Sequence, residues 1–164
     1  MKKAETMKSS ESNIVDIKCS STNIKEVKKL AYRGLDIYAV KRSPGSHASL
    51  ESLCGFIAEW WCGYVKVPAD MHSLFKPRGY IDETVLDELD DPNKYNLASA
   101  HGGYTYIGYG IPLVLDNNQE VFLGWDYNHC YDAGTCVTYN DVITEGKKVI
   151  DSMLSKVYRS EEKE

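Results

Sequence analysis

Asp126, His129 and Asp132 stand at even three-residue steps in the segment GWDYNHCYD, which follows an apolar run. In a helix, residues three apart are neighbours with Cβ atoms about 5–6 Å apart, and a tight turn can also bring such side chains together. Carboxylate and imidazole ligands suit Zn²⁺ or Mn²⁺, and a site with three protein ligands leaves a position for water. Such a water, with its pKa lowered by the metal, would be the nucleophile that hydrolyses a phosphoester or an amide.

A further polar group of this kind is His101, in the segment HGGYTY. Gly102 and Gly103, which follow it, allow positive φ angles or the close approach of a ligand to the backbone. The hydroxyl of Thr105 can donate a hydrogen bond to a phosphate or a carboxylate. We therefore predict a divalent metal site, for Zn²⁺ or Mn²⁺, with the ligands His101, Asp126, His129 and Asp132.

Other interpretations of the same residues stay open. Asp126 and Asp132 could accept backbone N–H bonds in a turn, with His129 packed beside them, and the spacing alone favours this structural role. Cys130 is a candidate nucleophile, but its acidic neighbours disfavour the thiolate that such chemistry needs. Neither His-Glu-x-x-His nor a dense Asp/Gly calcium loop occurs in the sequence, so no residue is assigned a catalytic role.

Aromatic side chains gather in the same segments as these polar groups and indicate binding without turnover. Ring faces stack on nucleobases, while nearby hydroxyl and amide groups hydrogen-bond the polar edges of a ligand. The aromatic residues are Trp60, Trp61, Tyr64, Tyr104, Tyr106, Tyr109 and Trp125. We predict a site for a small polar or nucleotide-like ligand formed by Tyr64, His101, Gly102, Gly103, Thr105 and Trp125. A tryptophan pair on one apolar strand is also typical of a core.

The composition narrows the classes of function. The 164 residues, with 43% hydrophobic content, suffice for one domain with a core. A net charge of −5 provides no basic field for DNA or RNA, so we expect no polymeric nucleic acid partner. No apolar run approaches the roughly 20 residues of a membrane span, and no signal peptide is recognised, so we expect a cytoplasmic protein without a membrane partner. The five cysteines form no Cys-x-x-Cys pair, which indicates reduced thiols.

Periodicity predicts strands and a short helix in the amino-terminal half of the chain. Ile24, Val27 and Leu30 have helical spacing and Gly34 follows them, so we predict a helix over 22–33. Strands are predicted from their β-branched and aromatic content at 13–19, 35–42 and 62–67.

The carboxyl-terminal half is predicted to contain a hairpin and two helices. Turn residues at 116–119 separate apolar runs at 113–115 and 121–123, which predicts a β-hairpin. Helices are predicted over 82–95, where the sequence is acidic, and over 138–157, where one apolar stripe runs along the segment.

Strands followed by a long helix, without regular βαβ alternation, predict an α+β fold. We expect a single two-layer domain over 13–158, with a mainly antiparallel sheet and the long C-terminal helix packed on it. A disordered tail is expected at 1–12 and a charged tail at 159–164.

The segments CGYVKVP, HSLF, HGGYTY, GWDYNHCYD and TYNDVITEGKKVIDSML follow one another within residues 61–157. In this combination the chain resembles a family of small uncharacterised proteins of phages, prophages and bacteria with HGGxTY and G(F/W)DxxHxxD motifs. The resemblance implies a shared polar site but no particular activity. The positions that it carries over are Gly63, Tyr64, Pro68, His101, Gly102, Gly103, Thr105, Gly124, Asp126, His129 and Asp132. The chain departs from the family at Cys130-Tyr131, where its relatives have Ala-Gly, and this change bears on Asp132 as a ligand.

The leading hypothesis is a phage-type accessory protein of the bacterial host cytoplasm that binds a small polar or nucleotide-like ligand, in host takeover or anti-defence. A metal-dependent hydrolase that uses the same His/Asp site is the alternative, and a protein–protein interaction module is a third hypothesis. The first two require that one hollow contains His101, Thr105, Asp126, His129 and Asp132.

Overall fold

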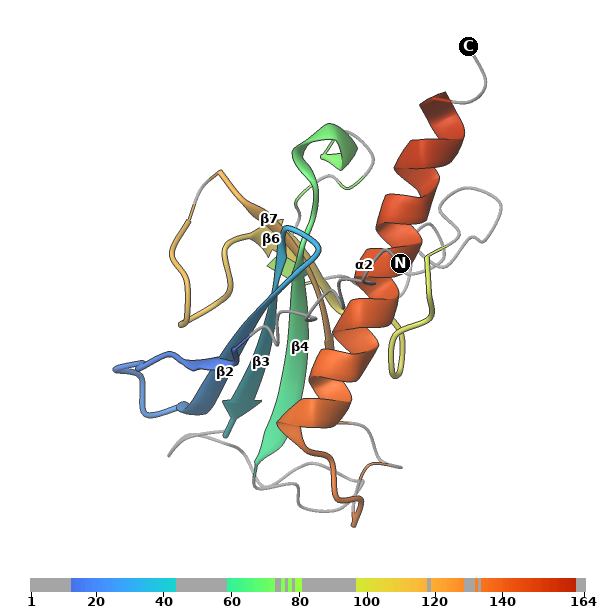
Figure 1. Cartoon of the computed structure of the whole chain (residues 1–164). Helices are drawn as coiled ribbons and strands as arrows, with labels where there is room; N and C mark the ends of the chain where they lie inside the picture. Colours follow the sequence, from blue (N-terminus) through green and yellow to red (C-terminus); the bar gives the residue numbers. More distant parts are fainter. Residues whose placement is uncertain are drawn as a thin grey trace, which may run out of the picture.

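The computed structural model describes residues 13–43, 59–72, 75, 77, 79–80, 97–117, 119–128, 132 and 134–161, the last six as backbone only. A seven-stranded antiparallel sheet carries one long helix on one of its faces (Figure 1). The strands are β1 (Val15–Asp16), β2 (Ile24–Tyr32), β3 (Leu35–Arg42), β4 (Trp60–Lys66), β5 (Gly79–Tyr80), β6 (Tyr106–Tyr109) and β7 (Val121–Asp126). The helix α2 spans Tyr139–Glu161, and a 3-10 turn, η2, spans Ala69–Met71. The predicted α+β fold, a mainly antiparallel sheet with a C-terminal helix packed on it, is confirmed.

Sheet order differs from chain order at one place. The strands lie in the order β1-β2-β3-β4-β7-β6-β5, so β4 pairs directly with β7. In this register Cys62 lies opposite Asp126, and Tyr64 lies opposite Gly124. This non-local pairing brings the ends of β3, β4, β6 and β7 together.

The helix predicted over 22–33 is wrong, because this segment forms β2 and the turn after it. Ile24 and Val27 belong to the apolar layer away from α2, whereas Leu30 belongs to the layer beneath α2. A register shift between Ile24 and Glu26 keeps Ile24 on the same face as Val27. Apolar positions three apart therefore arise from a β-bulge and from burial on both faces of a strand.

Gly34 belongs to a hairpin turn and not to a helix end. Arg33 and Gly34, between β2 and β3, both have positive φ angles of 49° and 80°. Positive φ at both central residues is the property of the type I′ turn, whose twist matches that of the two strands.

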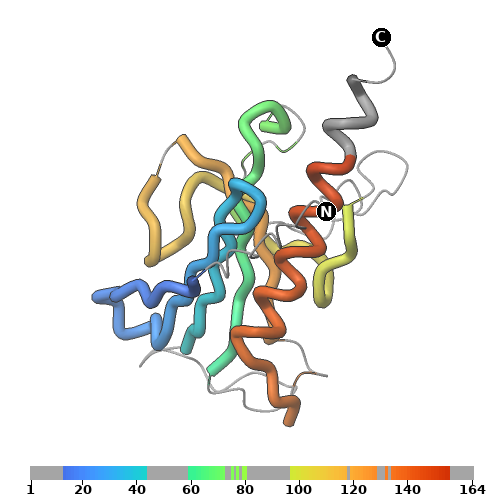
Figure 2. The backbone as a smooth tube through the Cα atoms, viewed as in Figure 1, coloured from blue at the N-terminus to red at the C-terminus, as the bar shows by residue number. Residues whose placement is uncertain are grey.

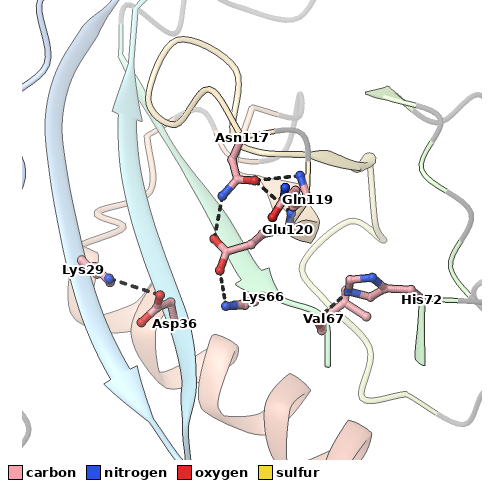
Figure 3. A network of polar contacts seen from close by, with 8 residues as sticks. All are labelled: Lys29, Asp36, Lys66, Val67, His72, Asn117, Gln119 and Glu120. Carbon is pink, nitrogen blue, oxygen red and sulfur yellow. Dashed lines mark hydrogen bonds and ion pairs between the residues drawn. The ribbon is translucent and has the colours of Figure 1, made fainter. Parts of the chain in front are cut away.

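The hairpin predicted from 113–115 and 121–123 is wrong in its first strand. The partner of β7 in the hairpin is β6, and residues 110–120 connect them. Asn117 nevertheless supplies turn chemistry, because its Oδ1 accepts the backbone N–H groups of Gln119 and Glu120 at 2.8 and 3.0 Å (Figure 3). Glu120 also forms an ion pair with Lys66 of β4, which fixes the connection against the sheet (Figure 3).

Helix α2 lies along β4, β3 and β2 and closes one face of the sheet (Figure 2). At its first turn, the backbone N–H of Thr138 donates to Asp141 Oδ2 at 2.7 Å, which is one of the two bonds of a capping box, and the Thr138 hydroxyl donates to the same oxygen at 2.9 Å. The core beneath it includes Trp61, Val65, Leu123, Trp125, Val142, Ile150 and Met153.

A second apolar layer covers the opposite face of the sheet. It contains Tyr38, Val40, Cys62, Tyr64, Tyr106 and Phe122, and Ile111 of the connection between β6 and β7 lies on it. Both faces of the central strands are therefore buried, which explains the near-continuous apolar sequence of β4.

Three further sequence predictions concern parts of the chain with limited description. The acidic helix predicted over 82–95 and the tail at 1–12 lie outside the described residues. The third prediction is the charged tail at 159–164: the backbone of α2 continues as far as Glu161, and residues 162–164 lie outside the described residues. Within the described part of the chain, no helix combines the length and the apolar character that crossing a bilayer demands.

Candidate functional site

A cavity of about 200 Å³ lies where the ends of β3, β4, β6 and β7 meet. Its walls include Cys62, Tyr64 and Tyr106, which belong to the apolar layer on the face away from α2. The strand ends add charged and polar groups to these walls, namely Arg42, Thr105, Asp126 and Asn128.

Arg42 is the buried cation of this cavity, with only 9% of its surface exposed. Its Nη2 donates to the hydroxyl of Tyr64 at 3.0 Å and to the carbonyl of Pro112 at 2.9 Å. Its Nε is buried and has no hydrogen-bond partner within the described residues. The ion pairs of the described residues all involve other cations, so no carboxylate neutralises Arg42 there.

The thiol of Cys62 and the hydroxyl of Tyr64, both close to Arg42, do not carry a neutralising charge at pH 7. Burial raises the pKa of the Cys62 thiol to about 12, and burial also raises the pKa of the Tyr64 hydroxyl. A guanidinium keeps its charge at any physiological pH. A buried charge without an opposite charge beside it is costly, so an acidic group that entered this cavity would be stabilised.

Asp126 is the acid of the same cavity, at the end of β7. Its Oδ2 accepts the hydroxyl of Thr105 at 3.0 Å, and its Oδ1 accepts the backbone N–H of Asn128 at 3.0 Å. Thr105 is held in place by its own N–H, which donates to the carbonyl of Gly124 at 2.9 Å. The carboxylate is therefore fixed by two bonds, and each of its oxygens can accept one more.

Aromatic rings form much of the remaining wall. Tyr106 makes edge-to-face contacts with Tyr64 and with Tyr80, both with ring centroids 5.6 Å apart. Tyr80 is 71% exposed and lies at the rim of the cavity, and half-buried Trp60 lines it as well. A flat ligand could contact the faces and edges of these rings.

His101 and Asp132 form a second polar group, which contacts α2. His101 Nε2 lies 2.7 Å from Asp132 Oδ1, and the imidazole stacks on the ring of Tyr127 with centroids 4.3 Å apart. The backbone N–H of His101 donates to Glu145 Oε1 of α2 at 2.6 Å, and the Tyr127 hydroxyl donates to the other oxygen of Glu145. Burial and this bond raise the pKa of Tyr127.

The residues predicted for one site thus divide between two places. Tyr64, Thr105, Trp125 and Asp126 line the cavity. His101 and Asp132 do not line it and pair with each other.

Gly102 and Gly103 do not line the cavity, and Trp125, which does line it, also belongs to the core beneath α2. Gly102 and Gly103 have positive φ angles of 66° and 84°, in the turn after His101. Trp125 is 1% exposed and lies so close to Gly63 that a side chain at Gly63 would clash with its ring.

His129, a predicted metal ligand, lies outside the described residues, as does Cys130. Among the residues that the structure does describe, no three His, Cys, Asp or Glu side chains converge to hold a metal ion. Metal binding through His129 stays a prediction.

The sequence prediction missed Arg42, the residue with the strongest electrostatic signal. Arg42 follows Tyr38 and Val40 at steps of two along β3, so strand alternation places it on the buried face. A basic residue at a position that alternation places on the buried face of a strand is the sequence signal that could have identified Arg42. Tyr80 was missed as well, because a two-residue strand leaves no recognisable pattern.

No family model matches the sequence, and comparisons with curated proteins and with solved structures gave no significant match.

Proposed function

We propose that this protein binds a small polar molecule with an acidic group in the cavity that Arg42 and Asp126 share. The observation that carries the proposal is the buried guanidinium of Arg42, which has a spare N–H and no carboxylate partner within the described residues. An acidic group of a ligand would supply the missing opposite charge, and charge-assisted bonds to Arg are among the strongest in proteins.

The size and the walls of the cavity limit the ligand. Pockets for drug-sized ligands have volumes of about 300–1,000 Å³, and this cavity has about 200 Å³. The part of the ligand that lies inside the cavity is therefore small. The rings of Tyr64, Tyr80 and Tyr106 favour a ligand with a flat or apolar middle part.

Ligand screening by thermal unfolding and tryptophan fluorescence tests the proposal. The panel contains nucleoside monophosphates, L-amino acids and small carboxylic acids, and Trp60 in the cavity wall serves as the reporter. A ligand at 100 times its dissociation constant should add about 2.7 kcal/mol to the free energy of unfolding. We expect at least one acid of the panel to bind saturably.

Arg42 variants show whether binding occurs in this cavity. Arg42→Met should abolish binding, and Arg42→Lys should weaken it because an ammonium lacks the planar fork of a guanidinium. Arg33→Met is the matched control, since Arg33 is exposed and pairs with Asp151 of α2. A flat response across the panel, or equal binding by the wild type and both Arg42 variants, would contradict the proposal.

A further inference from the structure

The two charged groups of the cavity come from different strands. Arg42 ends β3 and Asp126 ends β7, and β4 lies between these strands. Neighbouring strands are about 4.8 Å apart, so the two residues start from backbones about 10 Å apart. No ion pair joins them, although both line the cavity. One ligand that meets both must carry its complementary groups at opposite ends.

Asp126 defines the chemistry at its own end. A carboxylate only accepts hydrogen bonds, and each oxygen of Asp126 already accepts one bond from the protein. One acceptor position per oxygen remains, and the two oxygens are held side by side. The best complement is a pair of adjacent N–H donors, because both acceptor positions are then satisfied by one planar group.

We infer that the ligand carries two adjacent N–H donors for Asp126 at one end and an acidic group for Arg42 at the other. This inference rests on the proposed function and names the class of ligand. Two kinds of molecule share the chemistry: a guanine nucleotide, whose base edge has adjacent N–H groups, and L-arginine, whose guanidinium has them. The rings of Tyr64, Tyr80 and Tyr106 favour the planar base.

Matched probe pairs test this assignment. GMP and IMP differ only by the amino group that completes the donor pair, and L-arginine and L-lysine differ by guanidinium against ammonium. A bidentate contact discriminates by about 1–3 kcal/mol, so wild-type protein should bind GMP about 5- to 150-fold more tightly than IMP. If the ligand is the amino acid, the protein should bind L-arginine more tightly than L-lysine by a similar factor.

Asp126→Asn tests the residue responsible. A carboxamide presents one acceptor and one donor, so the affinities for GMP and IMP should differ by no more than about two-fold. Binding of the acidic end of the ligand to Arg42 should persist. Thr105→Val should lower the ratio of the GMP and IMP affinities partly, because the Thr105 hydroxyl donates to Asp126 Oδ2 and positions the carboxylate. Asp70→Asn, at an exposed position of the turn η2, is the control and should leave the ratio of the GMP and IMP affinities unchanged.

The failures of the two proposals are distinguishable. If acids bind through Arg42 but GMP and IMP bind equally, and L-arginine and L-lysine also bind equally, the inference is overturned and the proposed function stands. The same holds if Asp126→Asn keeps the wild-type ratio, or if only acids without N–H donors bind. If no acid of the panel binds, both fail.

Discussion

Arg42 and Asp132 are the two buried charged side chains of the described residues. Arg42 bonds to Tyr64 in the apolar layer away from α2, whereas Asp132 bonds to His101 in the group that contacts α2. The imidazole that bonds to Asp132 can carry a positive charge, whereas the groups that bond to Arg42, a tyrosine hydroxyl and a backbone carbonyl, are neutral. This difference is why Arg42, and not the His/Asp pair, carries the functional proposal.

The pairing of His101 with Asp132 should contribute measurably to stability. The Asp132 side chain is 4% exposed, and breaking a buried polar pair leaves an unsatisfied group. A double-mutant cycle of His101→Gln and Asp132→Asn, followed by urea unfolding, should give a coupling energy of about 1–2 kcal/mol.

The exposed pair of Lys28 with Asp16 provides the comparison, since the Asp16 side chain is 75% exposed. Its cycle should give a smaller coupling energy than the cycle of His101 and Asp132, because solvent screens an exposed ion pair. Equal coupling in both cycles would mean that burial of Asp132 does not strengthen the pair.

At the scale of elements, the start of α2 should respond to acid. Hydrogen bonds from the backbone N–H and the hydroxyl of Thr138 lower the pKa of Asp141 below its ordinary value. A carboxylate with a lowered folded-state pKa stabilises the fold above its unfolded pKa, and the contribution is lost as the pH falls through the folded pKa.

Asp141→Asn should therefore cost about 0.3–1 kcal/mol at pH 7 and much less at pH 3, as measured by urea unfolding at both pH values. The effect is modest because Asp141 is exposed and screened by solvent. Asp116→Asn, an exposed carboxylate of the connection before β7, is the control. A constant cost between pH 7 and pH 3 would exclude the charge of Asp141 as the cause.

The elements differ in how far their sequences predicted them. The strand at 35–42, the central strand at 62–67 and the terminal helix were predicted because each has one dominant period or a long apolar run. The segment 22–33 misled because a bulge gives its apolar residues helical spacing. Local periodicity cannot separate a bulged strand, buried on both faces, from one face of a helix.

At the scale of the whole molecule, local sequence also could not predict which residues form the site. Thr105 and Asp126 were both candidates in the sequence, but they are in contact only because β6 lies beside β7. Arg42 lines the same cavity as Asp126 only because a single strand, β4, lies between β3 and β7. Strand order is a property of the complete fold. The sequence could therefore supply polar candidates from separate segments without showing which of them share a cavity.

The two faces of the sheet should be energetically separable. Met153 of α2 is fully buried in the core between the helix and the sheet, and the cavity lies on the opposite face of the sheet. Met153→Ala should lower the free energy of unfolding by about 2–5 kcal/mol.

The folded Met153→Ala protein should bind the best acid of the panel with a nearly unchanged dissociation constant, because Arg42 and Asp126 lie on the other face of the sheet and Trp125 alone of the described residues belongs both to the core of Met153 and to the cavity wall. Urea unfolding and fluorescence titration measure the two quantities. A parallel loss of affinity would show that the helix face and the cavity are coupled.

The short first strand has a consequence for the behaviour of many copies in solution. β1 covers only the middle of β2, opposite Lys28 and Lys29, while Lys25 is exposed near the beginning of β2. Lys28 and Lys29 lie in the part that β1 covers, so Lys25 is the lysine in the uncovered part of β2, where a lysine disfavours pairing with a strand of a neighbouring copy. Lys25→Thr should therefore make association of copies through this edge of the sheet easier.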